Sequence, residues 1–349
     1  MQADEGEGFK GQDKVYVENE NIGPKIMVVG VGGAGCNTIN RIIRGGGGAY
    51  AELLAINTDK VHLSTVSNEA KRILIGKGVT KGLGAGGFPE IGKKCAMVAK
   101  KELENILQGV DLLFITAGMG GGTGTGAAPV IAQIAKEAGA IVVSMVTYPF
   151  NLERSRLKIA QEGVDELCKS SDTLVLIDNN RLLNYAPNIP IEKAFELVDE
   201  ITSKAVKGIV ETISVPSLIN LDFADVRSVM NEGGVSMIAV GEASGVDRVN
   251  TIAENTLKHR LLDVDYEGAK GVLLHITGGQ DLTLGDATAV GERFTEMVDK
   301  SANVTLGARI DPAMRDRIEV IAIFTGVKSE SLMGKKNDEG EGRIEDLLF

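Results

Sequence analysis

Tryptophan is absent from this sequence of 349 residues, and aromatic residues make up only 4% of it. A buried core must therefore rest on aliphatic side chains, which a hydrophobic content of 43% can supply. Acidic residues outnumber basic ones, and the formal net charge is -11. Because binding to nucleic-acid phosphates draws on clustered lysine and arginine, we expect no nucleic-acid partner.

Long apolar runs are also missing. Runs such as residues 112–117 and 141–146 fall far short of the roughly 18 to 20 residues that a membrane span needs, so we expect no direct membrane insertion. The N-terminus is acidic where a secretory signal would be basic and then apolar. The three cysteines, Cys36, Cys95 and Cys168, form neither a metal-ligand spacing nor an even disulfide framework. We expect a cytoplasmic protein with reduced thiols and no protein-built metal site.

Glycine, by contrast, occurs 44 times. Apolar segments that predict strands occur at residues 25–31, 51–59, 111–118, 140–148 and 173–179. Helical patterns alternate with them at residues 37–44, 127–138 and 154–167. Apolar strands that alternate with helices indicate an α/β fold with a doubly wound parallel sheet. We predict this domain over residues 23–190, preceded by a disordered acidic arm at residues 1–22.

A second part of the chain begins with a long helix. Between residues 191 and 213, apolar side chains recur at spacings of three and four, which predicts about six helical turns. This central helix, residues 191–216, is expected to lead into a smaller α+β domain at residues 217–328. Its expected strands and helices are residues 235–244, 247–262, 271–279, 284–299 and 317–327. The polar residues 329–349, ending in RIEDLLF, are interpreted as a flexible linker and a terminal peptide.

The loop GVGGAGCN at residues 30–37 follows the first strand and opens a helix. Glycine permits positive φ and lets backbone amides approach an anion at the positive end of a helix dipole. Taken alone, the loop fits the dinucleotide pattern GxGxxG, with Asp59 about 20 residues on as a ribose-binding acid. This loop is therefore compatible with NAD or FAD binding, and equally with a tight structural turn.

The loop GMGGGTGTGAAP at residues 118–129 again joins a strand to a helix. It supplies a run of free amides and two hydroxyl groups, which can enclose a di- or triphosphate without a lysine. Two such loops exceed what a dinucleotide-binding enzyme needs, and neither contains the P-loop pattern GxxxxGK(S/T). Together they predict a nucleotide site outside the P-loop class.

These loops, together with AINTD, GLGAGGFPEIG, PFNLE and NLDFADV, resemble FtsZ, the prokaryotic relative of tubulin, in an archaeal-type form. The resemblance runs from about residue 25 to residue 327 and rests most on GGGTGTG and NLDFADV. It implies a cytoskeletal protein of the cell-division ring that binds and hydrolyses GTP.

The resemblance also implies which residues hold the phosphates of GTP or GDP. They are Gly33, Ala34, Gly35, Cys36 and Asn37 of the first loop and Gly121, Gly122, Thr123, Gly124 and Thr125 of the second. Ala85, Gly86 and Gly87 match a loop that senses the terminal phosphate, although their composition alone would also allow a plain turn. Mg²⁺ is expected to bind mainly through the phosphates.

Other positions match the family's contacts to the sugar. Glu153 and Arg156 match its acid and base, but this sequence is one residue shorter between them. Arg154 is therefore an alternative to Arg156.

The positions around the guanine base match Asn179, Phe195 and Asp199. Phe195 and Asp199 are four residues apart and share a helix face. There a ring can stack on the base while a carboxylate accepts from guanine N1–H and the 2-amino group. A solvated helix acid is the alternative for Asp199.

The resemblance places catalysis in the segment NLDFADV, at Asn220, Asp222 and Asp225. In FtsZ this loop reaches the γ-phosphate of the neighbouring subunit, so hydrolysis requires head-to-tail protofilaments of the protein with itself. The bland alternative is that the two acids only cap a helix. The terminal peptide is expected to bind a membrane-associated division adaptor.

Two rival classes remain at this point. An NAD(P)-dependent Rossmann oxidoreductase would explain the first loop and Asp59, but it leaves GGGTGTG and the acid pair unexplained. A nucleotide-binding scaffold without hydrolysis would lack the acid pair, whereas Asp222 and Asp225 are both present.

Overall fold

The computed structural model of the chain describes residues 23–46, 48, 51–180, 190–215, 217–219, 221–231, 235–257 and 266–327. Within these residues the strands form a ten-stranded sheet in the order β3-β2-β1-β4-β5-β6-β7-β10-β8-β9. The predicted acidic arm, the predicted linker and the terminal peptide lie outside the described residues.

Six neighbouring strands of this sheet are parallel, as predicted. They are β1 (Ile26–Val31), β2 (Glu52–Asn57), β3 (Lys71–Leu74), β4 (Leu112–Gly118), β5 (Ile141–Tyr148) and β6 (Thr173–Asp178). All six residues of β1 are buried, because the sheet is covered on both faces. In the order β3-β2-β1-β4-β5-β6, the strands after β1 are added on one side and those after β4 on the other, so the direction of winding switches between β1 and β4. Doubly wound sheets bind ligands beyond the carboxyl ends of the strands at such a switch point.

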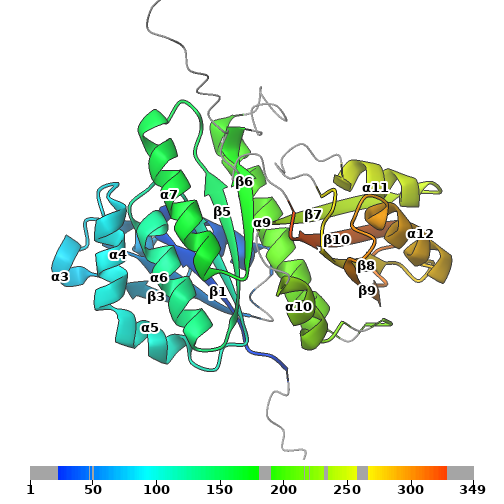
Figure 1. Cartoon of the computed structure of the whole chain (residues 1–349), viewed down its shortest axis with the longest axis horizontal. Coiled ribbons are helices and arrows are strands. Elements are labelled where there is room, and N and C mark those ends of the chain that lie inside the picture. Colours follow the sequence, from blue (N-terminus) through cyan, green and yellow to red (C-terminus); the bar gives the residue numbers. More distant parts are fainter. Residues whose placement is uncertain are drawn as a thin grey trace, which may run out of the picture.

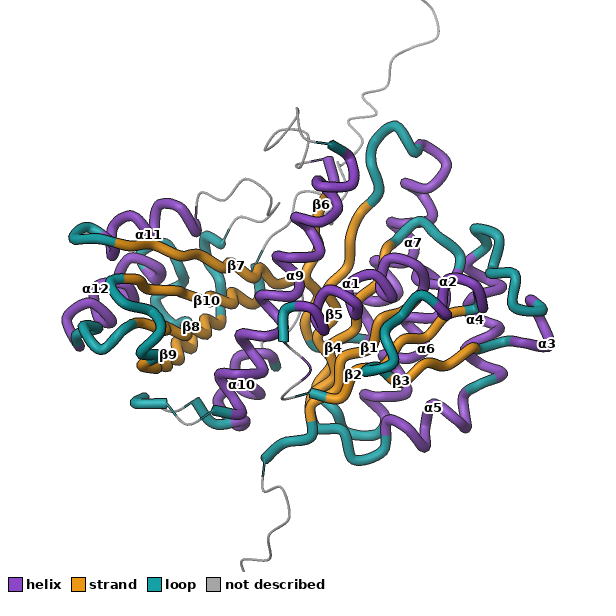
Figure 2. Tube along the Cα trace, turned by 180° about the vertical axis from the view of Figure 1, so that it is seen from behind, coloured by secondary structure: helices purple, strands orange, loops and turns teal. Residues whose placement is uncertain are grey.

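Helices lie on both faces of the parallel strands (Figures 1 and 2). One face is covered by α4 (Pro89–Val98), α5 (Lys100–Leu107), α6 (Thr123–Glu137) and α7 (Arg154–Ser170). The other face is covered by α1 (Gly32–Arg44), α2 (Lys60–Ser64), α9 (Ile191–Ser214) and α10 (Phe223–Met230). The short α3 (Lys77–Thr80) precedes α4. Two separate apolar cores result, one on each side of the sheet.

The central helix α9 spans 24 residues and agrees with the predicted helix. The elements that follow α10 are β7 (Val235–Ser244), α11 (Arg248–Leu257), β8 (Gly271–Gly278), α12 (Leu284–Thr295), β9 (Asn303–Ile310) and β10 (Arg317–Thr325). β10 pairs antiparallel with β7 and β8, and a third apolar core lies among these elements. β6 and β7 pair at two positions, so the sheet continues between the two halves. The proposed domain boundaries therefore stay a prediction.

Several elements differ from the sequence prediction. α1 begins at Gly32 and α6 at Thr123, so both helices start inside the glycine loops rather than after them. The short polar edge strand β3 was not predicted. The strand β9 was not predicted either. Gly307 interrupts its apolar pattern, and a Cβ at Gly307 would collide with Leu221, which packs against this position.

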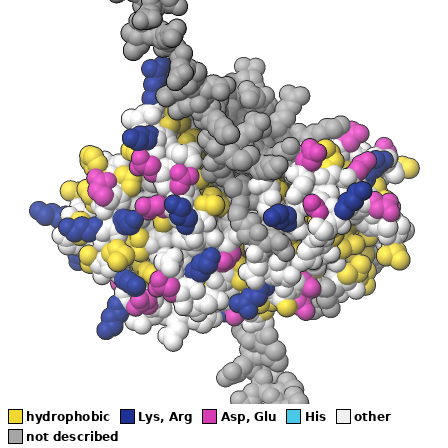
Figure 3. Space-filling view, viewed as in Figure 1, with side chains coloured by type: hydrophobic (Ala, Val, Ile, Leu, Met, Phe, Trp, Pro, Cys, Tyr) yellow, Lys and Arg dark blue, Asp and Glu magenta, His cyan; other side chains and the backbone are white. Residues whose placement is uncertain are grey.

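The described surface carries mixed charge. Figure 3 shows lysine and arginine side chains interspersed with aspartate and glutamate over the face in view. Among the helices of the described residues, none has the length and apolar character to cross a bilayer.

Packing between α4 and α6 depends on Gly126, because a Cβ there would collide with the carbonyl oxygen of Pro89. A backbone carbonyl cannot rotate aside as a side chain can, so α4 would have to move. Gly126→Ala is expected to lower the free energy of unfolding by about 1–3 kcal/mol, as overpacked sites do. Chemical denaturation of the purified protein measures this change.

The matched control is Gly291→Ala in α12, where an added Cβ meets nothing within 4 Å. It should raise the free energy of unfolding by about 0.5–1 kcal/mol, because alanine favours a helix over glycine. Equal effects of the two substitutions would contradict the packing described for α4 and α6.

Candidate nucleotide-binding site

A cavity of about 930 Å³ lies at the switch point of the parallel sheet. Val31, Asn57, Gly118 and Thr147, at or near the carboxyl ends of four strands, contribute to its wall. The far side is closed by α9 through Phe195 and Asp199. The cavity therefore receives residues from both glycine loops and from the central helix.

The helix that follows the first loop points its N-terminus at this cavity. α1 has no side-chain cap and no acidic residue in its first turn, so its first amides lack a side-chain acceptor. Gly33, Ala34 and Asn37 line the cavity. Free amides at a helix N-terminus favour an anion such as a phosphate.

The second loop repeats this arrangement beside the first. α6 also lacks a side-chain cap and an acidic first turn, and Gly121 to Gly124 line the cavity. A Cβ on Gly32 would lie 2.9 Å from the backbone nitrogen of Gly124, so the two loops touch without side chains between them. Among the described residues that line the cavity there is no lysine.

The loop after α3 forms a third wall through Gly84, Ala85 and Gly87. Gly84, Gly86 and Gly87 all have positive φ, at 85°, 61° and 82°. L-residues rarely adopt this conformation, so the loop depends on its glycines. Ala85 packs against Gly122 of the second loop, which ties the third wall to the phosphate-binding region.

Other residues of the cavity wall are suited to a sugar and a base. Arg156 Nη1 donates to Glu153 Oε2 at 2.6 Å. Phe195 is 42% exposed, and its ring meets that of Phe150 edge-on, with 5.8 Å between centroids. Asn179 is buried, and its Oδ1 has no hydrogen-bond partner among the described residues.

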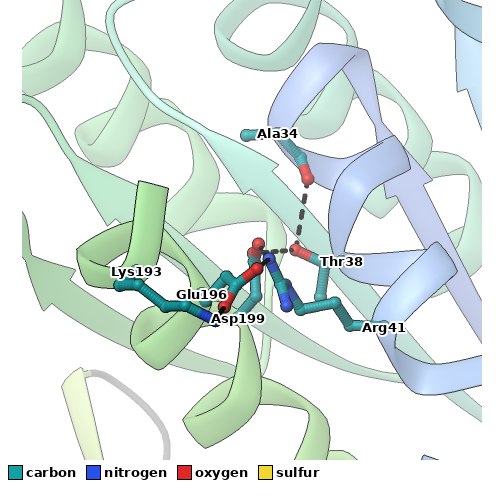
Figure 4. A network of polar contacts seen from close by, with 6 residues as sticks. All are labelled: Ala34, Thr38, Arg41, Lys193, Glu196 and Asp199. Carbon is teal, nitrogen blue, oxygen red and sulfur yellow. Dashed lines mark hydrogen bonds and ion pairs between the residues drawn. The ribbon is translucent and has the colours of Figure 1, made fainter. Parts of the chain in front are cut away.

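Asp199 is held by two side chains of α1 (Figure 4). Its Oδ1 accepts from Thr38 Oγ1 at 2.9 Å and its Oδ2 from Arg41 Nε at 2.9 Å. Burial raises the pKa of Asp199, and the hydrogen bonds from Arg41 and Thr38 oppose this rise. The carboxylate therefore keeps an ordered position although most of it is removed from water.

Most nucleotide-contacting residues expected from the sequence meet at this cavity. Those in its wall are Gly33, Ala34, Asn37, Ala85, Gly87, Gly121, Gly122, Thr123, Gly124, Glu153, Arg156, Asn179, Phe195 and Asp199. Arg154, the alternative to Arg156, does not belong to the wall.

Four expected residues do not line the cavity: Gly35, Cys36, Gly86 and Thr125. Cys36 is fully buried in the core under α1, and burial raises the pKa of its thiol to about 12. Gly35 packs against β4, where a Cβ would collide with the carbonyl oxygen of Thr116. The thiol of Cys36 is thus a core group rather than a ligand group.

Other residues of the wall were not predicted from the sequence. Asn40, Arg41 and Arg44 lie three, four and seven positions after Asn37, on the same face of α1. That spacing was a usable signal once the helix start was known. His62 also lines the cavity, with Nδ1 lacking a partner in the described part of the chain. Asp59, the ribose-binding acid of the oxidoreductase hypothesis, caps α2 by accepting from the amides of Val61 and His62.

The predicted catalytic acids lie away from this cavity. Asp222 Oδ1 accepts from the amide of Asp225 at 2.8 Å, and Asp225 Oδ2 accepts from the amide of Asp222 at 3.0 Å. The two acids form a capping box at the start of α10. Asn220, the third predicted residue, lies outside the described residues.

The fold and the cavity together are typical of a nucleotide-binding protein outside the P-loop class, with two glycine loops in the cavity wall. Comparison with known proteins identifies its class. The family model "Tubulin/FtsZ family, GTPase domain" matches residues 25–187, and "FtsZ family, C-terminal domain" matches residues 234–328.

Individual relatives agree with the family models. The chain is 57% identical over 323 residues to Cell division protein FtsZ 2 of Methanocaldococcus jannaschii, covering 92% of this chain and 84% of that protein. It is 49% identical over 328 residues to Cell division protein FtsZ 2 of Halobacterium salinarum, covering 93% and 83%. A solved FtsZ dimer of M. jannaschii matches with a TM-score of 0.81 and 45% identity, covering 87% of this chain and 88% of that one.

The chain therefore belongs to the FtsZ branch of the tubulin/FtsZ family of GTPases. This membership implies binding of GTP and GDP and does not favour the NAD(P)-dependent oxidoreductase that the first loop alone allowed.

Thr125 supports the second loop from beneath. Its Oγ1 accepts from the amide of Gly120 at 2.9 Å, and both groups are buried. Thr125→Val keeps the shape but leaves this amide unsatisfied, which should lower the free energy of unfolding by about 1–3 kcal/mol. Thr125→Ser keeps the acceptor and should preserve GTP affinity better than Val does. Calorimetry and nucleotide titration measure both effects, and a valine variant that binds GTP as tightly as wild type would contradict this supporting role.

Proposed function

We propose that this protein assembles head to tail in the cell-division ring and that each GTP is hydrolysed at the interface between adjacent subunits. One observation carries the proposal: the nucleotide cavity and the acid pair lie at opposite ends of α9. Asp199 lines the cavity, whereas Asp222 follows the other end of the helix. A helix rises about 1.5 Å per residue, so the stretch from Asp199 to Ser214 alone spans roughly 22 Å.

Neither Asp222 nor Asp225 lines the cavity of its own subunit. We therefore assign both acids to the nucleotide of a neighbouring subunit. A neighbour that stacks its α10 end on the cavity would supply them. The solved M. jannaschii FtsZ described as a dimer supports self-association of this kind. Action in the cytoplasm at the division site is part of the same proposal and rests on the cell-division relatives.

Nucleotide binding follows from the groups around the cavity. The phosphates would lie on the free amides of α1 and α6, with Ala85 and Gly87 beside the terminal phosphate. Glu153 and Arg156 would contact the sugar. Mg²⁺ held mainly by phosphate oxygens would supply the positive charge that neither loop contains.

The base would lie against Phe195 and Asn179, with Asp199 as the acceptor for its edge. Guanine offers N1–H and a 2-amino group to that carboxylate. Adenine has an acceptor at N1, which would face the charge of Asp199. The cavity therefore favours GTP over ATP.

The acid pair keeps capacity for a water molecule. Each carboxylate uses one oxygen in the capping box, which leaves the other oxygen of Asp222 and of Asp225 for the attacking water. The preceding segment is fixed to β9, because Ile219 and Ala308 exchange two backbone hydrogen bonds of 3.1 and 3.2 Å. Asn220 between these points is proposed as the third member of the site. Capping and water activation are thus compatible roles.

The terminal peptide completes the proposal. Ile344, Leu347 and Leu348 have the spacing of one helix face and would fit the groove of a membrane-associated division adaptor. This segment lies outside the described residues.

Dilution tests the interface mechanism directly. If the site is assembled from two subunits, GTP turnover should rise more steeply than first order with protein concentration and vanish on dilution. Phosphate release measured over a hundredfold range of concentration, alongside pelleting with GTP and GDP, gives the answer. Constant turnover per subunit across that range would show that one chain contains the whole site.

Asparagine substitutions separate capping from catalysis in the acid pair. Asparagine caps a helix about as well as aspartate, so Asp222→Asn and Asp225→Asn should keep stability and GTP affinity. Loss of the carboxylate that activates water should still lower turnover by about a hundredfold or more. Asp222→Ala should lose both the cap and the turnover.

Mixing wild type with Asp225→Asn adds a control for action across the interface. A mutant subunit presents its defective loop to a neighbour's nucleotide, so it should depress the activity of wild-type subunits in shared filaments. If the two proteins share filaments and the GTP turnover of the mixture equals the sum of the separate turnovers, Asp222 and Asp225 only cap the helix.

A further inference from the structure

The contacts of Asp199 leave a defined set of acceptor sites. A carboxylate offers about four lone-pair sites, two on each oxygen. Thr38 uses one site on Oδ1 and Arg41 uses one on Oδ2. One site on each oxygen remains, which equals the number that guanine N1–H and the 2-amino group require.

Both side chains that donate to Asp199, those of Thr38 and Arg41, belong to α1 (Figure 4). Thr38 Oγ1 also lies 3.2 Å from the carbonyl oxygen of Ala34. Its single proton favours Asp199, because that contact is shorter and its acceptor is charged. The Nε of Arg41 donates to Oδ2 at 2.9 Å, and its guanidinium brings a positive charge to the carboxylate.

We propose that Arg41, assisted by Thr38, positions the Asp199 carboxylate so that its two remaining acceptor sites match the guanine edge. Arg41 is thereby a specificity-determining residue that acts through Asp199. The inference rests on the proposed base contact of Asp199. It assigns no direct contact with the base to Arg41.

The arrangement also joins the two ends of the nucleotide site. Arg41 and Thr38 belong to the helix whose N-terminus faces the phosphates, whereas Asp199 belongs to α9. Arg41 Nη2 lies 3.7 Å from Glu196 on α9, and Lys193 Nζ lies 2.9 Å from the same carboxylate. The phosphate-binding helix therefore sets the orientation of the base-binding acid.

Charge around Asp199 predicts how the variant behaves with pH. Thr38 and Arg41 face it from α1, and Glu196 faces it from its own helix. Without Arg41, burial and Glu196 raise the pKa of Asp199 with less opposition. The ionised form is present above the pKa and is lost as pH falls through it, so the variant should lose guanine preference at a higher pH than wild type.

The test uses the full chain and competition of GTP, ITP and ATP against a fluorescent GTP analogue. ITP lacks the 2-amino group, so the GTP-to-ITP ratio reports one hydrogen bond of the base. Arg41→Met should lower the preference for GTP over ATP by about tenfold or more, the size expected for a lost hydrogen bond to a charged group. Arg41→Lys should fall between Met and wild type, because it keeps the charge but not the planar fork.

Thr38 provides a matched pair of variants. Thr38→Ser keeps the hydroxyl and should preserve the preference, whereas Thr38→Val removes it and should lower the GTP-to-ITP ratio. Arg293→Met, on α12 outside the cavity wall, controls for loss of an arginine in general. Thermal unfolding of each variant shows whether the fold is kept.

The double variant with Asp199→Ala separates the possible outcomes. If Arg41 acts through Asp199, Arg41→Met should change base preference little once Asp199 is alanine. An equal effect in both backgrounds would overturn the positioning role and indicate a direct nucleotide contact. If Asp199→Ala alone leaves the preference for GTP unchanged, the proposed base contact is refuted. If Asp199→Ala changes this preference but a folded Arg41→Met variant does not, only the positioning role of Arg41 is refuted.

Discussion

The direct contact of two glycine loops at the carboxyl ends of β1 and β4 is the constraint on which the site depends. Gly32 approaches the backbone of Gly124, and Gly124 in turn lies so close to Gly118 that a Cβ would sit 2.6 Å from its carbonyl oxygen. Any side chain at these points would separate the loops. Because they touch, the N-termini of α1 and α6 face one cavity, and their free amides can replace the lysine of a P-loop.

The central helix α9 connects the cavity to the segment that carries the proposed catalytic acids. Its first half closes the cavity through Phe195 and Asp199, and the segment that carries Asp222 follows its last residue, Ser214, in the chain. Gly208 lets the helix lie close against β10, since a Cβ there would collide with Ile321. The helix thus separates the cavity from the proposed catalytic acids, which is why the proposed hydrolysis needs a second subunit.

Two buried polar side chains at the site differ in their hydrogen bonds. The carboxylate of Asp199 is removed from water but bonded on both oxygens, and Oδ1 of Asn179 is buried with no partner within the described residues. Buried polar groups normally find partners. The two contacts of Asp199 order this acceptor in advance.

The sequence by itself determined the strand-loop-helix units, the doubly wound sheet and the two phosphate loops, because apolar runs and glycine spacing act over a few neighbouring residues. It also indicated Asp222 and Asp225, whose capping box is equally local. Only the tertiary structure decided which side chains meet at the cavity. Each residue turns a helical side chain by about 100°, so starting α1 at Gly32 directs Cys36 into the core and Arg41 toward the cavity. Arg41 and Asp199 meet across 158 positions of chain, a distance over which no local pattern carries information.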